Sequence, residues 1–294
     1  MLNRSCTLGV TAVLFCSLWA TACSRPKPIT IGSKDTVEQR ILGEIVAQLV
    51  ERRIKTPVVR RLALGDSKIA YQSLIGGEIG MYPEYTGLVI LDHLKETPDL
   101  QATVVFERAR QEMKKIGMIE VLDPLGFDGG PAMLVRASTN MGIDTLTQAA
   151  ASKTPWKLGV TSEFQSRSEG TSVLNRYHIQ MGAPMRALRP VQMFKAVEEG
   201  TINMIAGTNS DGHLTTPEWK ALADDQKAFA PEQAVLMVRE DVLAAEPELR
   251  NVLKQLSGKI DLATMRTLNA RVEINERTVE DVAREFLKTA GLDK

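Results

Sequence analysis

The chain has 294 residues, which is enough for two domains of ordinary size. Its 36 basic and 36 acidic residues cancel, so no global field favours nucleic acid or an anionic membrane surface as a partner. The hydrophobic fraction of 44% and the charged fraction of 24% are typical of a soluble globular protein.

The N-terminus has the pattern of an export signal. Arg4 supplies positive charge, residues 8–19 form a short apolar run, and small residues at 20–22 precede Cys23. The run is shorter than the ~20 residues of a membrane-spanning helix. A small residue followed at once by cysteine resembles a bacterial lipobox, while Ala-x-Ala also suits the general signal peptidase. We predict a signal peptide at 1–22, lipidation of Cys23 and a tether at 23–28.

The first part of the remaining chain alternates strands and helices. Asp35 and Glu38 have the spacing of a capping box, so a helix is expected to begin at Asp35. Pro83 has no N–H to donate and is expected to end the third strand. A helix is then expected to restart at Gly87. This alternation predicts a parallel sheet covered by helices. The expected elements are a strand, a helix, a strand, a helix and a strand at 29–31, 35–50, 57–64, 69–75 and 79–82.

The rest of the chain predicts a second α/β unit. Residues 122–132 contain too many glycines and prolines for a regular element and are interpreted as a crossover between domains. Residues 235–238 are interpreted as the return crossover. We therefore predict one lobe from residues 29–132 and 236–294, and another from residues 133–235. A cleft between two such lobes is a common place for a small ligand.

Several loops are expected to meet at that cleft. In open parallel sheets, ligands gather at the carboxyl ends of the strands. The loops at 32–34, 65–67 and 82–87 follow strands of the first unit, and the loop at 207–212 follows a strand of the second. The helix N-terminus after the loop at 82–87 offers free backbone N–H groups, which favour an anionic ligand group.

A set of motifs keeps one order along nearly all of the chain after the signal. They are Ile31-Gly-Ser-Lys-Asp-Thr-Val-Glu-Gln39, Gly77-Glu-Ile-Gly-Met-Tyr-Pro-Glu-Tyr-Thr-Gly87, Glu163-Phe164 with Arg167, Ser210-Asp-Gly212, Leu222-Ala-Asp-Asp225, Leu256-Ser-Gly-Lys-Ile260, Leu268-Asn269 and Val282-Ala-Arg-Glu-Phe-Leu287. In these motifs the chain resembles the substrate-binding lipoproteins of ABC importers for glycine betaine, carnitine and choline. The resemblance implies an α/β, two-lobed type 2 periplasmic-binding (Venus-flytrap) fold, each lobe a mostly parallel sheet with covering helices.

The resemblance also implies a site. Gln39 and Thr86 match positions that hold the ligand carboxylate in relatives. Relatives surround the quaternary ammonium group with aromatic rings, where cation–π attraction is worth about 2 kcal/mol or more when desolvated. Three of those positions correspond here to Pro131, Thr208 and Glu232, so we expect the aromatic cage to be lost.

These substitutions suggest a changed ligand. The hypothesis is a solute that keeps an anionic or strongly accepting end and offers N–H or O–H donors to Glu232 and Asp128. The alternative is that both carboxylates are solvated hinge residues. Arg167 is either a cleft residue or a surface ion-pair partner. The predicted ligand site comprises Ser33, Gln39, Tyr85, Thr86, Asp128, Arg167, Thr208, Asn209, Asp211 and Glu232.

The function expected from these features is capture of a small osmolyte-like solute by lobe closure, without cofactor, metal or catalysis. The three histidines lack metal-ligand spacing, although His213 follows the loop at 207–212. The expected partners are an ABC permease and, through the lipid on Cys23, a membrane face of the cell envelope. The protein is expected to be a monomer that does not bind nucleic acid. Two alternatives remain: a sensing or scaffold lipoprotein, and a hydrolase that uses Asp211 and Glu232.

Overall fold

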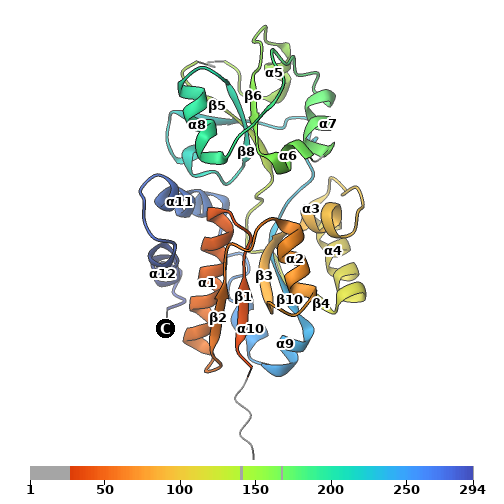
Figure 1. Cartoon of the computed structure of the whole chain (residues 1–294), viewed down its shortest axis with the longest axis vertical. Helices are drawn as coiled ribbons and strands as arrows, with labels where there is room; N and C mark the ends of the chain where they lie inside the picture. The colour runs from red at the N-terminus through yellow and green to blue at the C-terminus, as the bar shows by residue number, and fades with distance from the viewer. Residues whose placement is uncertain (1–26, 140–141, 167, 294) are drawn as a thin grey trace, which may run out of the picture.

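The computed structural model describes residues 27–139, 142–166 and 168–293. These residues form two α/β lobes, one above the other in Figure 1, and each lobe is built on a five-stranded sheet. The predicted signal peptide, the lipidation at Cys23 and the predicted site residue Arg167 lie outside the described residues. No helix of the described residues is long and apolar enough to cross a membrane.

The lower lobe contains the sheet β2-β1-β3-β10-β4. β1 pairs in parallel with β2 and β3, whereas β10 is antiparallel to β3 and β4. Its strands are β1 (Ile29–Gly32), β2 (Val58–Arg61), β3 (Met81–Tyr85), β4 (Ile119–Val121) and β10 (Ala234–Arg239). Its helices are α1 (Val37–Arg53), α2 (Ser67–Ile75), α3 (Thr86–Leu88), the π-helix η1 (Val89–His93), α4 (Ala102–Gly117), α9 (Glu240–Ala245), α10 (Leu249–Lys254), α11 (Leu262–Glu273) and α12 (Val279–Thr289).

The upper lobe contains the sheet β7-β6-β8-β5-β9. β6 is parallel to β7 and β8, and β5 is antiparallel to β8 and β9. Its strands are β5 (Pro131–Arg136), β6 (Leu158–Val160), β7 (Arg186–Ala187), β8 (Met204–Thr208) and β9 (Trp219–Leu222). Its helices are α5 (Leu146–Ala151), α6 (Ser162–Ser166), α7 (Ser168–Arg176), α8 (Pro190–Glu198) and the 3-10 helix η2 (Gly212–Thr215).

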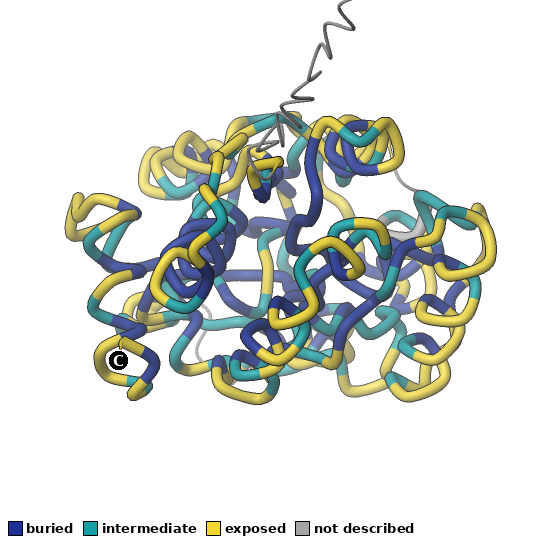
Figure 2. Tube along the Cα trace, turned by 90° about the horizontal axis from the view of Figure 1, so that it is seen from below, coloured by how far each residue is buried: buried dark blue, intermediate teal, exposed yellow. Residues whose placement is uncertain are grey.

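Apolar side chains cover both faces of each sheet, which gives each lobe three layers. In the lower lobe, one buried cluster joins the sheet to α1, α10, α11 and α12, and a second joins it to α2 and α4. Two further clusters cover the faces of the upper sheet. Figure 2, a view from below, shows buried segments through the middle of the molecule and exposed segments around them.

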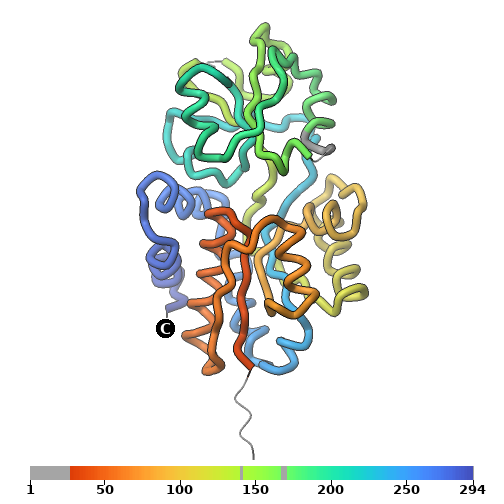
Figure 3. Tube along the Cα trace, in the orientation of Figure 1, coloured from red at the N-terminus to blue at the C-terminus, as the bar shows by residue number. Residues whose placement is uncertain are grey.

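Two crossovers, residues 122–130 and 223–233, connect the lobes (Figure 3). They are joined by an antiparallel bridge between Asp128 and Gln233. The Gly129 N–H also donates to the Glu232 carbonyl oxygen at 2.9 Å. The lobes therefore share a hydrogen-bonded, two-segment hinge.

The sheets are more mixed than the sequence predicts. Residues 235–238, interpreted as the return crossover, instead belong to β10 in the lower sheet, and residues 131 and 132 belong to β5 in the upper sheet. Each of these strands enters its lobe from the hinge. It therefore runs opposite to the strands that end at the cleft, and half of the strand pairings in each sheet are antiparallel.

Two local predictions near the cleft are wrong. The strand does not end at Pro83, because β3 continues to Tyr85. The Thr86 N–H donates to the Gln233 carbonyl, and the alternation of an antiparallel ladder then puts Pro83, opposite Leu236, at a position that donates no N–H to β10. On the other side of β3, the pairing with β1 is at Met81 and does not reach Pro83. The N-cap of α1 is Thr36 rather than Asp35, because the Thr36 hydroxyl accepts the Gln39 N–H.

Helix α11 brings the lower lobe into direct contact with the upper one. In Figure 1 it lies at the top of the lower lobe, beside the upper lobe. Asn269 Nδ2 donates to the Ser210 carbonyl oxygen at 2.9 Å, and Arg266 Nε donates to the Asn209 carbonyl oxygen at 2.7 Å. The two lobes are therefore linked by a packed helix in addition to the hinge.

Candidate functional site

A cavity of about 490 Å³ lies between the lobes. The first turn of α1 and the end of β3 line it from below, and the loops after β6 and β8 line it from above. Gly129 and Glu232 contribute from the hinge. This position matches the cleft that the strand pattern predicts.

Acidic side chains dominate the cavity wall. Lys34 is the single lysine or arginine among the described residues that line it. Lobe closure would therefore surround a bound molecule with an excess of negative charge, which favours a cation. The acidic lining residues are Asp35, Glu38, Asp66, Glu163, Asp211, Glu232 and Glu273.

The charge of Lys34 is balanced behind the wall by Glu84. Lys34 Nζ forms a buried ion pair with the Glu84 carboxylate and lies 3.1 Å from Ser67 Oγ. The Tyr82 hydroxyl donates to Glu84 Oε2 at 3.1 Å, and His93 Nε2 lies 3.6 Å from it. Burial alone would raise the pKa of Glu84, but the Lys34 charge and the hydrogen bonds from His93 and Lys34 outweigh it and lower the pKa to about 2.

Glu38 has a different environment. The Tyr85 hydroxyl donates to Glu38 Oε1, and Asn269 Nδ2 donates to Oε2 at 2.7 Å. Burial raises the pKa of Glu38, and the hydrogen bonds from Ser210, Tyr85 and Asn269 offset this only in part. The sequence interpretation used Glu38 as a helix-capping residue. With Thr36 as the N-cap, the third helical position is Gln39 rather than Glu38, and Glu38 lies in the cavity wall.

Three aromatic rings line the cavity, and two of them, Phe164 and Phe194, were not among the predicted ligand-binding residues. Phe164 of α6 and Phe194 of α8 line it from the upper lobe, and Tyr85 lines it from the lower lobe. Phe194 stacks on His213 with ring centroids 3.4 Å apart and meets the edge of Trp219 at 4.9 Å. The expected loss of the aromatic cage rested on the three positions that match tyrosines in relatives, and Tyr85 was predicted separately as a site residue. The Glu163-Phe164 motif was a signal for one of these rings.

Four of the predicted ligand-binding residues lie in the cavity wall: Tyr85, Thr208, Asp211 and Glu232. Ser33 and Thr86 do not, because their hydroxyls serve the backbone. Ser33 Oγ accepts the Ala63 N–H at 3.1 Å, and Thr86 Oγ1 accepts the Gln233 N–H at 3.1 Å. Both side chains fix the loops that carry the site.

Three more predicted residues also lie outside the cavity wall. Gln39 is 1% exposed, and neither of its amide atoms has a hydrogen-bond partner of normal geometry among the described residues. Asp128 accepts the N–H groups of Gly130 at 2.8 Å and Glu232 at 2.9 Å, so it holds the hinge. Asn209 and Asp128 both line a separate cavity at the hinge.

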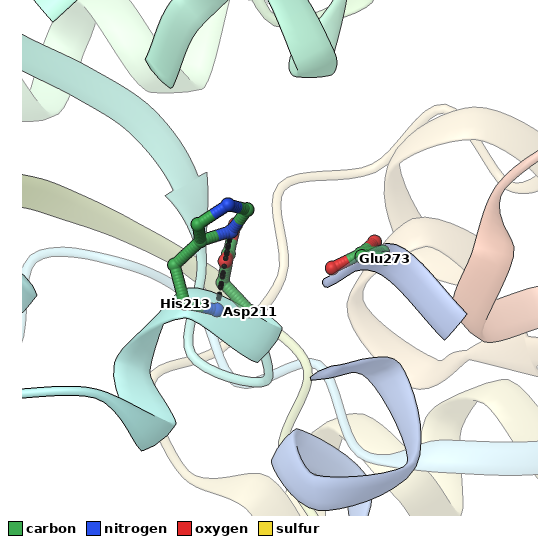
Figure 4. A group of neighbouring side chains, drawn as sticks. All are labelled: Asp211, His213 and Glu273. Atoms are coloured by element: carbon green, nitrogen blue, oxygen red, sulfur yellow. Dashed lines mark hydrogen bonds and ion pairs between the residues drawn. The ribbon is translucent and has the colours of Figure 1, made fainter. Parts of the chain in front are cut away.

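A group of three ionisable side chains, Asp211, His213 and Glu273, lies at one side of the cavity, and Asp211 and Glu273 line its wall (Figure 4). Asp211 Oδ1 accepts the His213 backbone N–H at 2.9 Å and lies 3.0 Å from His213 Nδ1. Glu273 keeps contact with solvent. The protein atoms that displace water around its carboxylate, together with the charge of Asp211, raise its pKa to about 7.

Two lobes, a two-segment hinge and a cavity between them define a solute-binding protein of the clamshell class. Comparison with known proteins identifies the family. The profile of the substrate-binding domain of ABC-type glycine betaine transport systems matches residues 27–289, so the chain belongs to that family. The match confirms the predicted family and the predicted function as a substrate-binding component.

Curated relatives are about a quarter identical. The ergothioneine transport permease/ergothioneine binding protein of Helicobacter pylori strain G27 is 27% identical over 90% of this chain, which spans about half (48%) of that relative's length. The glycine-betaine-binding protein of Pseudomonas aeruginosa is 27% identical over 92% of this chain and 90% of its own length. The carnitine transport binding protein of Listeria monocytogenes is 26% identical over 98% of this chain and 97% of its own length.

Solved structures confirm the two-lobed fold. A crystal structure described as a glycine betaine/carnitine/choline ABC transporter has a TM-score of 0.80 at 24% identity, covering 90% of this chain and all of its own. A lactococcal glycine betaine complex in its closed conformation has a TM-score of 0.64 at 14% identity, covering 91% of this chain and 97% of its own. The predicted type 2 periplasmic-binding fold is therefore correct.

Proposed function

We propose that the protein binds a small solute with a positively charged group, of the glycine betaine, choline and carnitine class, and delivers it to an ABC permease. The observation that carries this proposal is the excess of carboxylates around a cavity that also presents three aromatic rings. Aromatic faces attract cations, and carboxylates add a longer-range attraction. The names of the curated relatives, which refer to ergothioneine, glycine betaine and carnitine, support this class.

This proposal changes the ligand inferred from the sequence. The hypothesis of N–H donors rested on Asp128 and Glu232, and both Asp128 oxygens are used by backbone N–H groups. A carboxylate end was assigned to Gln39 and Thr86, and neither lines the cavity. The charge of Lys34 is matched by Glu84. The positive group is therefore the recognised part of the solute, and a ligand carboxylate contributes less.

Transport would follow from lobe closure. A solute that contacts both lobes favours the closed arrangement by its greater affinity for that arrangement, and a permease can then distinguish the loaded protein from the empty one. As part of the same proposal, lipidation at Cys23 would hold the protein at the outer face of a membrane and raise its effective concentration near the permease. The protein would act as a monomer in this cycle.

Isothermal titration calorimetry of the purified protein tests the proposed ligand class. The titrants are choline, glycine betaine, carnitine, ergothioneine and 3,3-dimethyl-1-butanol, which is the neutral carbon analogue of choline. We expect choline to bind in the micromolar range, at least as tightly as glycine betaine, and the neutral analogue to bind about tenfold or more weakly. Equal binding of choline and its neutral analogue, or no binding of any cation, would rule out this proposal.

The aromatic contribution is tested by Phe164→Leu, which keeps an apolar side chain but removes the ring. Loss of one cation–π contact of about 1–2 kcal/mol would weaken choline binding by roughly 5–30-fold. Phe106→Leu is the matched control, because Phe106 lies on α4 away from the cavity. Unchanged choline affinity in Phe164→Leu would show that this ring does not contact the cation.

A further inference from the structure

Asp211, His213 and Glu273 offer three possible metal-ligand atoms that all lie within 4.8 Å of one another. Asp211 and His213 belong to the upper lobe, at the start of η2, and Glu273 ends α11 of the lower lobe. Figure 4 shows Glu273 extending from α11 toward the other two side chains. The group therefore spans the interface between the lobes.

The spacing of the donors suits a metal ion. Asp211 Oδ1 and His213 Nδ1 are hydrogen-bonded at 3.0 Å, and two tetrahedral ligands of a zinc ion lie about 3.4 Å apart, so only a small movement is needed for both atoms to bind one ion. The His213 ring is held in place because it stacks on Phe194 at 3.4 Å. Two of the three donors are thus already arranged before any ion binds.

The charges also favour a cation. Two carboxylates face one another across the lobe interface, and among the described residues no lysine or arginine pairs with either of them within 4 Å. Arg266 attracts Asp211 electrostatically, but its Nε donates a hydrogen bond to the Asn209 carbonyl oxygen at 2.7 Å. A divalent ion would balance the charge that this arginine leaves unpaired.

A second, independent observation comes from Asn269, which lies one helical turn before Glu273 and lines the same cavity. Its side chain is 3% exposed, and its Oδ1 has no hydrogen-bond partner among the described residues. Its Nδ2 is fixed by the acceptors Glu38 Oε2 and Ser210 O, so the amide orientation is determined. A buried amide oxygen without a donor is expected to have a partner, and a hydrated cation provides one.

We propose that Asp211, His213 and Glu273 bind a divalent transition-metal ion, of which Zn²⁺ is the first candidate, and that this ion links the two lobes. A donor set of one imidazole and two carboxylates suits such ions better than Mg²⁺ or Ca²⁺, which prefer oxygen donors alone. Three protein ligands leave a coordination position for water or a solute oxygen. Because the donors come from both lobes, the ion favours the arrangement that brings the lobes together.

Calorimetric titration of Zn²⁺ into the purified, solute-free protein without a polyhistidine tag tests the site. We expect one ion per chain, with affinity at least tenfold lower in Glu273→Gln and in His213→Ala. His178→Asn and Glu280→Gln are matched controls, because both residues are exposed and lie outside the group. The absence of saturable Zn²⁺ binding, or unchanged affinity in both site variants, would overturn the proposal.

Small-angle X-ray scattering of the same solute-free protein tests the link between lobes. Zn²⁺ is expected to reduce the radius of gyration of the wild type, and Glu273→Gln is expected to abolish that reduction. Binding of Zn²⁺ with no change in scattering would contradict a bridging ion. Because no solute is present, either result is independent of the proposed transport ligand.

Discussion

Glu84→Gln is expected to lower the free energy of unfolding by about 3–5 kcal/mol, because it leaves the Lys34 ammonium group buried without its partner. Lys34 and Glu84 are 6% and 0% exposed, so water cannot replace the lost contact. Tyr82 and His93 also lose their shared charged acceptor. Urea denaturation followed by circular dichroism measures the effect.

Two control variants separate this effect from general damage. In the double variant Lys34→Met/Glu84→Leu no charge remains unpaired, so much of the stability should return. Glu96→Gln breaks the exposed Glu96–Arg108 pair and should cost less than about 1 kcal/mol. A loss in Glu84→Gln no larger than that in Glu96→Gln would show that the buried pair is not important for stability.

The same carboxylate predicts a pH dependence. The pKa of Glu84 is about 2 in the folded protein and ordinarily 4.5, so its contribution to stability is present above pH 4.5 and is lost as the pH falls toward 2. The shift corresponds to about 3 kcal/mol. Between pH 6 and pH 3 the wild type should therefore lose more stability than Glu84→Gln. Parallel pH profiles for the two proteins would contradict this assignment.

Gly212→Val is expected to weaken solute binding by roughly tenfold or more. A Cβ atom at Gly212 would lie 2.5 Å from the Ala270 backbone nitrogen and 2.8 Å from its Cα, so α11 would have to move away from η2. That movement would break the lobe contact made by Asn269 to the Ser210 carbonyl. Overpacking of this kind costs about 1–3 kcal/mol, and here that cost would destabilise the closed arrangement of the lobes.

Calorimetry with choline and small-angle scattering measure the affinity and the lobe separation of Gly212→Val. We expect a larger radius of gyration and an unchanged secondary-structure spectrum, because neither lobe core is touched. Gly200→Asn is the control, since a side chain there meets nothing within 4 Å and asparagine tolerates positive φ. Wild-type affinity and scattering in Gly212→Val would show that the α11–η2 contact has no role in closure.

The fold was largely predictable because its strongest signals are local. Two of these signals can be recognised without knowledge of tertiary contacts: the alternation of strands and helices through residues 29–85, and the order of the family motifs. The role of residues 235–238 was not predictable in the same way. An apolar run reads equally as a connection or as a central strand, and only its pairing with β3 and β4 places it in the lower sheet. Likewise, Pro83 is tolerated in β3 because of its register with β10.

The site was less predictable because it depends on side-chain direction. Glu38 and Gln39 are neighbours in the sequence, yet Glu38 lines the cavity whereas Gln39 is buried and does not line it. The predicted capping role of Glu38 depended on Asp35 being the N-cap, and it is lost when the N-cap is Thr36. The Lys34–Glu84 pair joins two recognised motifs 50 residues apart, and spacing alone does not reveal such a contact.

In the proposed transport cycle, the lobes close on a small cation held in the cavity between them. Small-angle X-ray scattering of the purified protein, with and without saturating choline, tests it most directly. We expect choline to decrease the radius of gyration, and 3,3-dimethyl-1-butanol at the same concentration to decrease it less. An identical radius of gyration with and without choline, under conditions where calorimetry shows the protein to be saturated, would contradict capture by lobe closure.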